Sequence, residues 1–414
     1  MIWLVSVSLA CGFVVSWATA FVVRRYAARF GLVDQPGKRK VHTHPVPLGG
    51  GLAIWAGLVV PFALGEIVIG MVPEDYSESV ASGGGAAPVA PNALDTHETK
   101  PGEAHWLAPL AQFVAPHVSG LRLRSADLWF FLAGATVLMA LGLFDDVRGV
   151  DWRLRLAVQT IVAAAVVFGW GWRFTLFIDV PWLTGALSVL WIVGLVNSFN
   201  MLDNMDGLAA GVAAICAIML AAVMLVAPSP LTHQPQLFVA GFLLVLAGSS
   251  LGFLWHNRPP ARLFMGDAGS YVLGFCLAVT TLLATFAGGD LPKHAILAPL
   301  CVLAVPLYDT ITVVWIRLRA GRSPFEGDTN HFSHRLVELG LSKSQAVLTI
   351  YLTTAACGLG ALVLHQVNVA GAVMIVLLVG CLLAVIAILE TTARRKMQPA
   401  KASGDGEPRP LKPR

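Results

Sequence analysis

Long apolar runs alternate with short polar segments along almost the whole chain. A helix needs about 17 to 25 apolar residues to cross the hydrocarbon core of a bilayer. Eleven runs meet this requirement, at residues 2–23, 48–71, 127–144, 154–171, 181–199, 207–227, 236–255, 269–288, 294–316, 344–365 and 368–390. Runs 127–144 and 181–199 are the weakest because they lead directly into polar motifs. The pattern predicts an all-α, polytopic integral membrane protein with about eleven transmembrane helices.

The composition supports a membrane protein. Of the 414 residues, 56% are hydrophobic and only 13% are charged, whereas soluble domains carry about 25% charged residues. The first run resembles a signal peptide in length, but its basic residues Arg24, Arg25 and Arg29 follow the run instead of preceding it, so we expect a retained helix. All six cysteines lie within apolar runs. Buried small side chains are therefore expected, and not a disulfide framework.

The distribution of basic residues predicts the orientation, because Lys and Arg stay on the cytoplasmic side of a membrane. Every second loop, starting with the first, carries several of them. The loops between, at 228–235, 289–293 and 366–367, are short and poor in basic residues. We therefore expect the N-terminus outside and the C-terminus in the cytoplasm.

Two segments differ in composition from the predicted membrane domain, which covers residues 1–390. Residues 72–126 are rich in Gly, Pro and Ala, and we expect them to form a flexible external insertion. Residues 391–414 are expected to form a cytoplasmic, largely disordered tail.

The polar clusters all fall on one side of this topology. They occupy the predicted cytoplasmic loops at residues 34–51, 142–159, 197–211, 255–270 and 321–340. Ionisable groups near membrane depth are costly and usually line a site or a water-filled cavity. The pattern therefore predicts a composite site at the cytoplasmic membrane surface.

The second and fourth of these loops carry aspartates at the ends of apolar runs. Asp145 and Asp146 follow an apolar run and could simply end a helix at the interface. Adjacent carboxylates repel each other, however, and a hard divalent cation such as Mg²⁺, which prefers carboxylate and amide oxygens, would relieve that repulsion. Asp267 lies between an apolar run and a predicted helix, where it could serve as an N-cap, as a catalytic residue or as both.

The third polar loop carries amides and carboxylates at regular spacing. Asn197 and Asn200 are three residues apart and would share one face of a helix. Asp203 and Asp206 continue the same spacing. A solvated helix end explains one or two such residues but not the whole run, so an oxygen-rich ligand site is the better interpretation.

The fifth polar loop contains an amphipathic pattern. His331, His334, Arg335 and Glu338 follow the spacing of one helical face. One interpretation is an interfacial helix that rests on lipid. The other is a basic clamp for phosphates, in which Arg335 offers a planar set of donors. A zinc site is disfavoured because no cysteine or third close histidine accompanies the pair.

These motifs together resemble those of the polyprenyl-phosphate N-acetylhexosamine-1-phosphate transferases, a membrane family that includes the phospho-MurNAc-pentapeptide transferase of peptidoglycan synthesis. The matching segments, in order along the chain, are "VDQPGKRKVHTHPVPLGGG", "LFDDVRG", "NSFNMLDNMDGLAAG", "RLFMGDAGSYVLGF" and "DTNHFSHRL". The resemblance covers residues 34 to about 340. Five motifs in the expected order are far more specific than any one of them.

The resemblance implies a reaction. The family transfers a sugar 1-phosphate from a UDP-sugar to a polyprenyl phosphate, releases UMP, and forms the lipid-linked sugar that starts a cell-envelope glycan. It also implies Mg²⁺ as cofactor, with Mn²⁺ as an alternative ion. The expected setting is the bacterial inner membrane, with lipid and the two substrates as partners and no nucleic acid. A homodimer is left open, as is the choice between direct attack and a phospho-Asp intermediate.

Site residues are also implied by the resemblance. Asp145 and Asp146 would form the catalytic pair, with Asp145 as the base for the lipid phosphate. Metal binding is implied for Asn200, Asp267 and Asp146. Substrate binding is implied for Asn197, Asp203, Asp206, Asn257 and Phe264, of which the last three are at nucleotide-contacting positions. Clamping of the diphosphate and sugar is implied for His331, His334 and Arg335. Asp267 and the clamp residues are included among the catalytic residues.

The sequence departs from the family pattern at three positions. Asn204 replaces a common Gly and is expected to be tolerated because Asn accepts a positive φ angle. Ser333 replaces a His found in many relatives, so that position cannot supply an obligatory acid or base. Arg155 replaces a common Lys, which preserves the charge but not the shape.

Two alternatives remain. The donor could be UDP-MurNAc-pentapeptide or another UDP-amino sugar, although Asp328, three residues before His331, and the eleventh span resemble the GlcNAc-type branch. The chain could also be a transporter or a non-catalytic scaffold. Transporters place their polar residues near the bilayer midplane, whereas these cluster at one interface.

Overall fold

A computed structural model describes residues 1–35, 45–71, 108–174, 178, 180–227, 229, 233–284, 286, 292–325, 328 and 330–402. Helices dominate these residues, and the strands among them form a single antiparallel pair of two-residue segments, β1 (Val33–Asp34) and β2 (Val46–Pro47). The predicted all-α class is confirmed.

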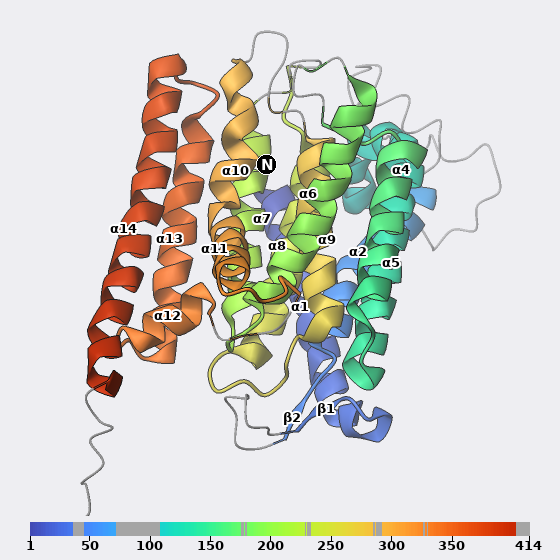
Figure 1. The fold of residues 1–414 in the computed structure, drawn as a ribbon. Coiled ribbons are helices and arrows are strands. Elements are labelled where there is room, and N and C mark those ends of the chain that lie inside the picture. Colours follow the sequence, from blue (N-terminus) through green and yellow to red (C-terminus); the bar gives the residue numbers. More distant parts are fainter. Residues whose placement is uncertain are drawn as a thin grey trace, which may run out of the picture. The chain divides into compact units, whose positions relative to one another are not determined.

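The helices are labelled in Figure 1. They are α1 (Ile2–Tyr26), α2 (Gly50–Gly70), α4 (Ala108–Arg148), α5 (Trp152–Ala164), α6 (Pro181–Leu202), α7 (Leu208–Val226), α8 (Leu237–Asn257), α9 (Gly266–Leu283), α10 (Ala298–Val302), α11 (Ala304–Arg319), α12 (Phe332–Glu338), α13 (Lys343–Val363) and α14 (Val369–Ala402), with short helical turns η1 (Ala27–Phe30), η2 (Ala165–Gly169) and η3 (Lys293–Leu297).

The membrane spans agree with the hydrophobic runs. Ten helical segments in the described part of the chain are long and apolar enough to cross a membrane, or 11 if one bent pair counts as a span. That pair, Lys293–Val302 and Ala304–Arg319, bends by 67° and corresponds to the predicted run 294–316. Pro306 explains part of the bend, because it has no N–H to donate to the carbonyl of Val302 in a continuous helix.

The chain forms two compact units, of which the first contains Met1–Leu58 and Ala135–Arg414. Within this unit, α8 packs against α1, α7 and α9, while α6 packs against α9 and α11. Helices α7, α8 and α9 are mostly buried, whereas α1 and α14 expose most of their apolar side chains. A helix that is apolar on all sides either lies in the interior or faces lipid, so the first three helices form the centre of this unit.

The second unit is Val59–Gly134. In it, the end of α2 is joined to α4 by two side-chain contacts. Arg122 donates to the carbonyl of Ile69 at 3.3 Å, and the Ser125 hydroxyl donates to Glu66 at 2.6 Å.

Two predicted segment boundaries require correction. The insertion expected at 72–126 is helical from Ala108 onward, because α4 begins there; residues 72–107 lie outside the described part. The tail expected to be disordered from 391 is helical as far as Ala402, and residues 403–414 also lie outside. Ala, Arg, Lys and Met are good helix formers, so the last turns of α14 can continue beyond the apolar run.

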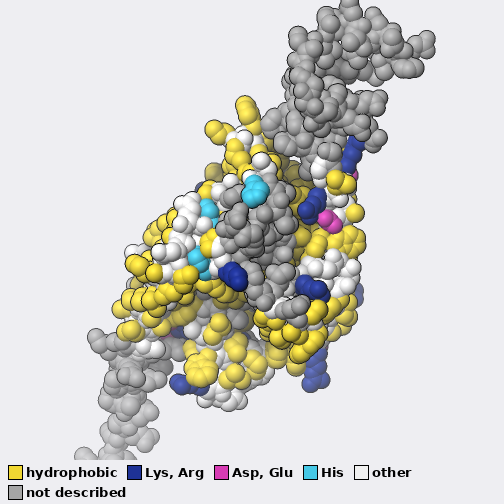
Figure 2. All heavy atoms as spheres, turned by 90° about the horizontal axis from the view of Figure 1, so that it is seen from above, with side chains coloured by type: hydrophobic (Ala, Val, Ile, Leu, Met, Phe, Trp, Pro, Cys, Tyr) yellow, Lys and Arg dark blue, Asp and Glu magenta, His cyan; other side chains and the backbone are white. Residues whose placement is uncertain are grey.

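Backbone hydrogen bonds position the segment before α9. The N–H groups of Gly50 and Gly51 donate to the carbonyls of Phe264 and Met265, each at 2.9 Å, and the Phe264 N–H donates to Pro47 at 2.9 Å. Figure 1 shows β1, β2 and α12 at one end of the first unit, opposite the N-terminus. Seen from the N-terminal end, the described side chains are mostly hydrophobic, with His and scattered Lys and Arg (Figure 2).

Candidate active site

The paired aspartates meet the start of α9. The Asp146 carboxylate accepts hydrogen bonds from the backbone N–H groups of Asp267 at 2.9 Å and Ala268 at 3.4 Å. It therefore caps α9 and lies at the positive end of the helix dipole. The alternative in which Asp267 is the N-cap is wrong: Asp267 lies in the first turn, and the side chain of the N-cap residue Met265 makes no capping bond. The Asp267 carboxylate is thus left to face the site.

Two glycines allow α4 and α9 to come this close. Gly266 has φ +72°, and a Cβ atom there would collide with the Asp146 carboxylate. Gly142 lies one turn before Asp146, where a Cβ atom would collide with the backbone of Ala268. Only glycine satisfies the backbone angle and the space at Gly266, which explains the Gly of the "MGD" motif.

Side chains from four helices surround Asp267. Arg155 on α5 lies 2.7 Å from Asp145 and 3.2 Å from Asp267, so the two carboxylates converge on one positive nitrogen. The Asn200 amide donates to Asp267 at 2.7 Å. The Tyr271 hydroxyl donates to Asp267 at 3.1 Å and lies 3.4 Å from Asp145. Asp145, Asp267 and Asn200, predicted separately from the sequence, are brought together.

The cluster is rich in negative charge. Asp203 caps the C-terminus of α6 and is half-buried. Burial, together with the charges of Asp267, Asp146 and Asp206, raises the pKa of Asp203 to about 8. Arg155 pairs with Asp145 and Asp267, and an additional cation would relieve the remaining repulsion among the carboxylates of the cluster.

The predicted nucleotide-contacting residues meet in one place. Asp206 accepts a hydrogen bond from the Ala261 N–H at 2.9 Å. Asn257 is buried, accepts from the Gly207 N–H at 2.9 Å and donates to the Leu263 carbonyl at 2.9 Å. The Asp206 bond joins the loop after α6 to the loop after α8. Asn257, the last residue of α8, contacts both of these loops. Phe264 lies near the end of the second loop. The Asn257 side chain braces two loops within the core, and its contact with a nucleotide stays a prediction.

Asn197 lies apart from the carboxylates. Its amide donates to Gln159 on α5 at 2.7 Å and to the Val193 carbonyl at 2.8 Å. The spacing of three residues does place it on the same helix as Asn200. However, its contacts tie α5 to α6, and the predicted substrate contact stays a prediction.

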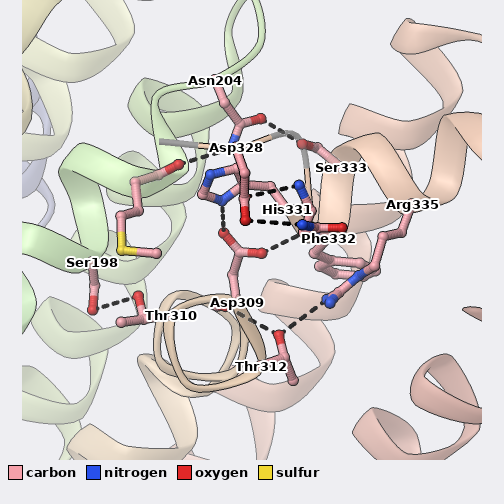
Figure 3. Close-up of polar contacts among 12 residues, drawn as sticks. Ser198, Asn204, Asp309, Thr310, Thr312, Asp328, His331, Phe332, Ser333 and Arg335 are labelled. Atoms are coloured by element: carbon pink, nitrogen blue, oxygen red, sulfur yellow. Dashed lines mark hydrogen bonds and ion pairs between the residues drawn. The ribbon is translucent and has the colours of Figure 1, made fainter. Parts of the chain in front are cut away.

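A second cluster surrounds the histidine loop (Figure 3). Asp309 on α11 lies 3.0 Å from Nδ1 of His331 and accepts a hydrogen bond from the Phe332 N–H at 2.6 Å. His331 precedes α12, and its ring centre is 6.4 Å from that of His334. Burial and the neighbouring His331 lower the pKa of His334 below its usual value.

Arg335 has a different environment from the one expected. It is 4% exposed, lies 3.0 Å from Glu390 on α14, and donates to Thr312 on α11 at 3.1 Å. Its guanidinium is also 5.8 Å from the ring centre of Tyr308. Arg335 neutralises a buried carboxylate and ties α12 to α14, and its place in a diphosphate clamp stays a prediction.

Another buried ion pair anchors the same loop. Arg317 on α11 lies 3.1 Å from Asp328, and both side chains are under a tenth exposed. Burial alone would raise the pKa of Asp328, but hydrogen bonds from Arg317 and Asn330 lower it to about 2. Asp328, which the sequence resemblance associated with His331, therefore holds the loop in place.

The end of α6 connects the two clusters. Ser333 donates to the Asn204 side chain, and Thr310 donates to Ser198 at 2.8 Å, while Asn200 between them reaches Asp267. Asn204 does not use the positive φ angle that Asn tolerates, because His233 is the non-glycine residue with positive φ in the described part of the chain. Gly207 takes that conformation instead, at φ +78°.

Comparison with known proteins places the chain in a family. The model of glycosyl transferase family 4 matches residues 128–285. The decaprenyl-phosphate N-acetylglucosaminephosphotransferase of Mycolicibacterium smegmatis is 30% identical over 86% of this chain and 80% of its own length. The chain belongs to glycosyl transferase family 4. The resemblance drawn from the motifs is thereby confirmed.

Other members of glycosyl transferase family 4 align over similar lengths. The probable undecaprenyl-phosphate N-acetylglucosaminyl 1-phosphate transferase of Bacillus subtilis is 28% identical over 95% of each chain. The undecaprenyl-phosphate alpha-N-acetylglucosaminyl 1-phosphate transferase of Escherichia coli K12 is 27% identical over 85% of this chain and 81% of its own length. The region matched by the family 4 model contains the Asp145–Asp146–Asp267 cluster but ends before Asp309 and His331.

Sequence reasoning missed three residues of these clusters. Tyr271 lies one helical turn after Asp267, a spacing that could have drawn attention to it. Asp309 and Glu390 are carboxylates inside apolar helices, and such residues are rare enough to suggest a buried partner. Their partners, however, come from other helices and could not be read from local spacing.

Proposed function

We propose that the protein transfers N-acetylglucosamine 1-phosphate from UDP-GlcNAc to a polyprenyl phosphate and releases UMP. The observation that supports this most strongly is the convergence of Asp145, Asp146 and Asp267 at the adjoining ends of two membrane helices. The names of its relatives favour GlcNAc as the sugar over a MurNAc-pentapeptide donor. The polar groups lie at helix ends and not at the bilayer midplane, which disfavours a transporter.

The carboxylate cluster suits a Mg²⁺ ion that binds together with the substrate. Among the described residues, no three Asp, Glu, His or Cys side chains form a metal site by themselves. Mg²⁺ is usually held by one or two carboxylates plus substrate phosphates and waters, so a complete protein cage is not required. Asp267, Asp146 and the amide oxygen of Asn200 would hold the ion, with Mn²⁺ as an alternative. When bound, it would neutralise charge on the diphosphate.

The protein's own groups position the reactants. Phosphoryl transfer depends mainly on alignment and charge neutralisation. Arg155 holds Asp145 and Asp267 on one side of the cluster, and its remaining N–H groups can donate to a phosphate. Asp145 would accept a proton from the lipid phosphate if that group arrives protonated. The lipid phosphate oxygen then forms a bond to the sugar-bearing phosphorus, and the bond to the UMP oxygen breaks.

The proposed site opens toward the cytoplasm. Its residues lie in the loops that carry most of the basic side chains, which the positive-inside rule assigns to that side. A UDP-sugar would reach the cluster from water, and the polyprenyl phosphate would reach it from the bilayer. We propose on this basis that the reaction takes place at the cytoplasmic face of a bacterial inner membrane.

A transfer assay tests the proposal. The purified protein in lipid nanodiscs would receive a polyprenyl phosphate and one labelled donor from UDP-GlcNAc, UDP-GalNAc, UDP-glucose or UDP-MurNAc-pentapeptide, with Mg²⁺ or with EDTA. We expect lipid-linked product and UMP only when the donor is UDP-GlcNAc and Mg²⁺ is present. Asp267→Asn should lose most of this activity, while the matched control Asp151→Asn should not, because Asp151 caps α5 and Asn caps equally well. The proposal is contradicted if none of the four donors gives product, or if transfer is equal with Mg²⁺ and with EDTA.

A further inference from the structure

Asp309 is a buried carboxylate that no sequence motif singled out. It is 1% exposed and lies on α11. One of its oxygens is 3.0 Å from Nδ1 of His331, and the other accepts the Phe332 N–H at 2.6 Å. Figure 3 shows both contacts running from α11 to the loop that begins α12. A single side chain thus holds the histidine ring and the backbone beside it.

This contact determines the state of the imidazole. A carboxylate oxygen only accepts hydrogen bonds, so the facing Nδ1 must carry the proton. The ring is then held with Nδ1–H toward Asp309, which leaves Nε2 for another partner. A neutral ring in this orientation has only a lone pair on Nε2, so an Nε2–H donor is available when both nitrogens carry protons, and Asp309 then pairs with the imidazolium.

The orientation of this loop is coupled to the carboxylate cluster. Thr310, next to Asp309, donates to Ser198 on α6 at 2.8 Å, and Ser333 donates to Asn204 at the end of the same helix. Between these two positions, Asn200 donates to Asp267 at 2.7 Å. The end of α6 therefore connects His331 to the groups that would bind the diphosphate.

We propose that Asp309 is the positioning residue for His331. It holds Nδ1–H so that the Nε2–H of the imidazolium is directed to a phosphate oxygen of the nucleotide-sugar diphosphate. The identity of that ligand rests on the proposed function, whereas the Asp309–His331 contact does not. Asp309 itself makes no contact with substrate and exchanges no proton in the reaction.

A purely structural role is the competing explanation, because Asp309 also binds the first N–H of α12. Asp309→Asn separates the two roles. The amide oxygen can still accept from the Phe332 N–H, but the amide NH₂ cannot accept from the Nδ1–H of His331. Thr312→Val is the matched control: it removes a hydroxyl one turn along α11 that contacts Arg335 and not His331.

Steady-state kinetics with UDP-GlcNAc test the coupling. We expect Asp309→Asn to lower kcat by at least about tenfold with a smaller change in KM, as for loss of a group that acts in the transition state. In a His331→Ala background the same change should cost no more than about twofold, because groups that act as a unit are not additive. Thr312→Val should keep kcat within about twofold. The proposal is overturned if the double variant loses activity by the product of the two single losses. It is also overturned if either Asp309→Asn or His331→Ala keeps full activity.

Imidazole NMR provides a test that needs no substrate. Protein labelled with ¹⁵N-histidine in nanodiscs would be studied at alkaline pH, and the His331 signals assigned by their loss in His331→Ala. We expect protonated Nδ1 in the wild type and Thr312→Val, and protonated Nε2 in Asp309→Asn. An Nε2–H form in the wild type overturns the inference. A wild type that is inactive with every donor would overturn the proposed function and leave this test intact.

Discussion

The carboxylate of Asp146 accepts the backbone N–H of Asp267 at 2.9 Å, across 121 positions of sequence. The interaction joins the end of α4 to the start of α9 and explains why a paired Asp motif and a Met-Gly-Asp motif occur in the same chain. One aspartate organises the helix terminus, and the other is turned toward Arg155 and Asn200. Several predictions can be derived from this arrangement and its surroundings.

Asp267 and Asp145 should respond differently to loss of charge. Asp267→Asn should lose most activity and need more Mg²⁺ for the remaining rate, because the proposed ion loses a charged ligand. Asp145→Asn should change the Mg²⁺ requirement little, and its residual rate should rise with pH as the lipid phosphate ionises by itself. Rates measured against Mg²⁺ and pH, with a thermal-unfolding check in detergent, distinguish them. Near wild-type turnover of Asp267→Asn would contradict its role as ligand.

Gly266→Ala should disable the site. The positive φ angle and the Asp146 carboxylate leave no room for a methyl group, and Ala in such a conformation costs about 1 kcal/mol or more before any clash. We expect a lower melting temperature and a loss of transfer activity. Gly194→Ala on α6 is the control, because a Cβ atom there meets nothing within 4 Å. If both variants behave alike, the contact between Gly266 and Asp146 does not constrain the site.

The pair Arg335–Glu390 should contribute mainly to stability. Removing one partner leaves a buried charge uncompensated, which typically costs about 3–5 kcal/mol. Arg335→Met and Glu390→Met should each lower the melting temperature, and the double variant should recover much of the loss. The comparison is thermal unfolding of the three variants in the same detergent. A stable Arg335→Met with no transfer activity would instead restore Arg335 to the diphosphate clamp.

The ion pair of Asp328 should make part of the stability dependent on pH. The folded-state pKa of Asp328 is about 2, below the ordinary value of 3.8, so its contribution is present above about pH 4 and is lost as the pH falls toward 2. Asp328→Asn should therefore be less stable than the wild type at pH 7, and the difference should shrink below pH 4. Thermal unfolding across this range measures it. A difference that does not change with pH would show that the charge of Asp328 is not responsible.

Cysteine labelling should test the orientation, which remains a prediction. In a background without native cysteines, Ser323→Cys and Gln366→Cys place single thiols at exposed positions in loops of opposite basic content. An impermeant reagent applied to intact cells should label position 366, and position 323 should react only after permeabilisation. The reverse pattern would place the N-terminus in the cytoplasm and the proposed site outside.

The sequence by itself determined the helices and the main members of the site. Helix length and apolarity are local properties that the bilayer thickness constrains, so the predicted runs agree with the spans, including the bent pair. Asp145, Asp146 and Asp267 were also identified, because their motifs retain both residue type and spacing. The sequence did not predict the first part of α4, before residue 126, or the extension of α14 to Ala402. Composition alone does not show where a helix begins or ends.

Only the tertiary structure decided what each polar side chain faces. Asp146 caps α9, Asp309 contacts His331, and Arg335 pairs with Glu390. Each of these contacts forms because helices distant in sequence pack together. The direction of a side chain depends on the rotation of its helix against neighbours, and periodicity gives the face but not the partner. For this physical reason, neither the Glu390 partner of Arg335 nor the contact between Asp309 and His331 could be predicted from the sequence.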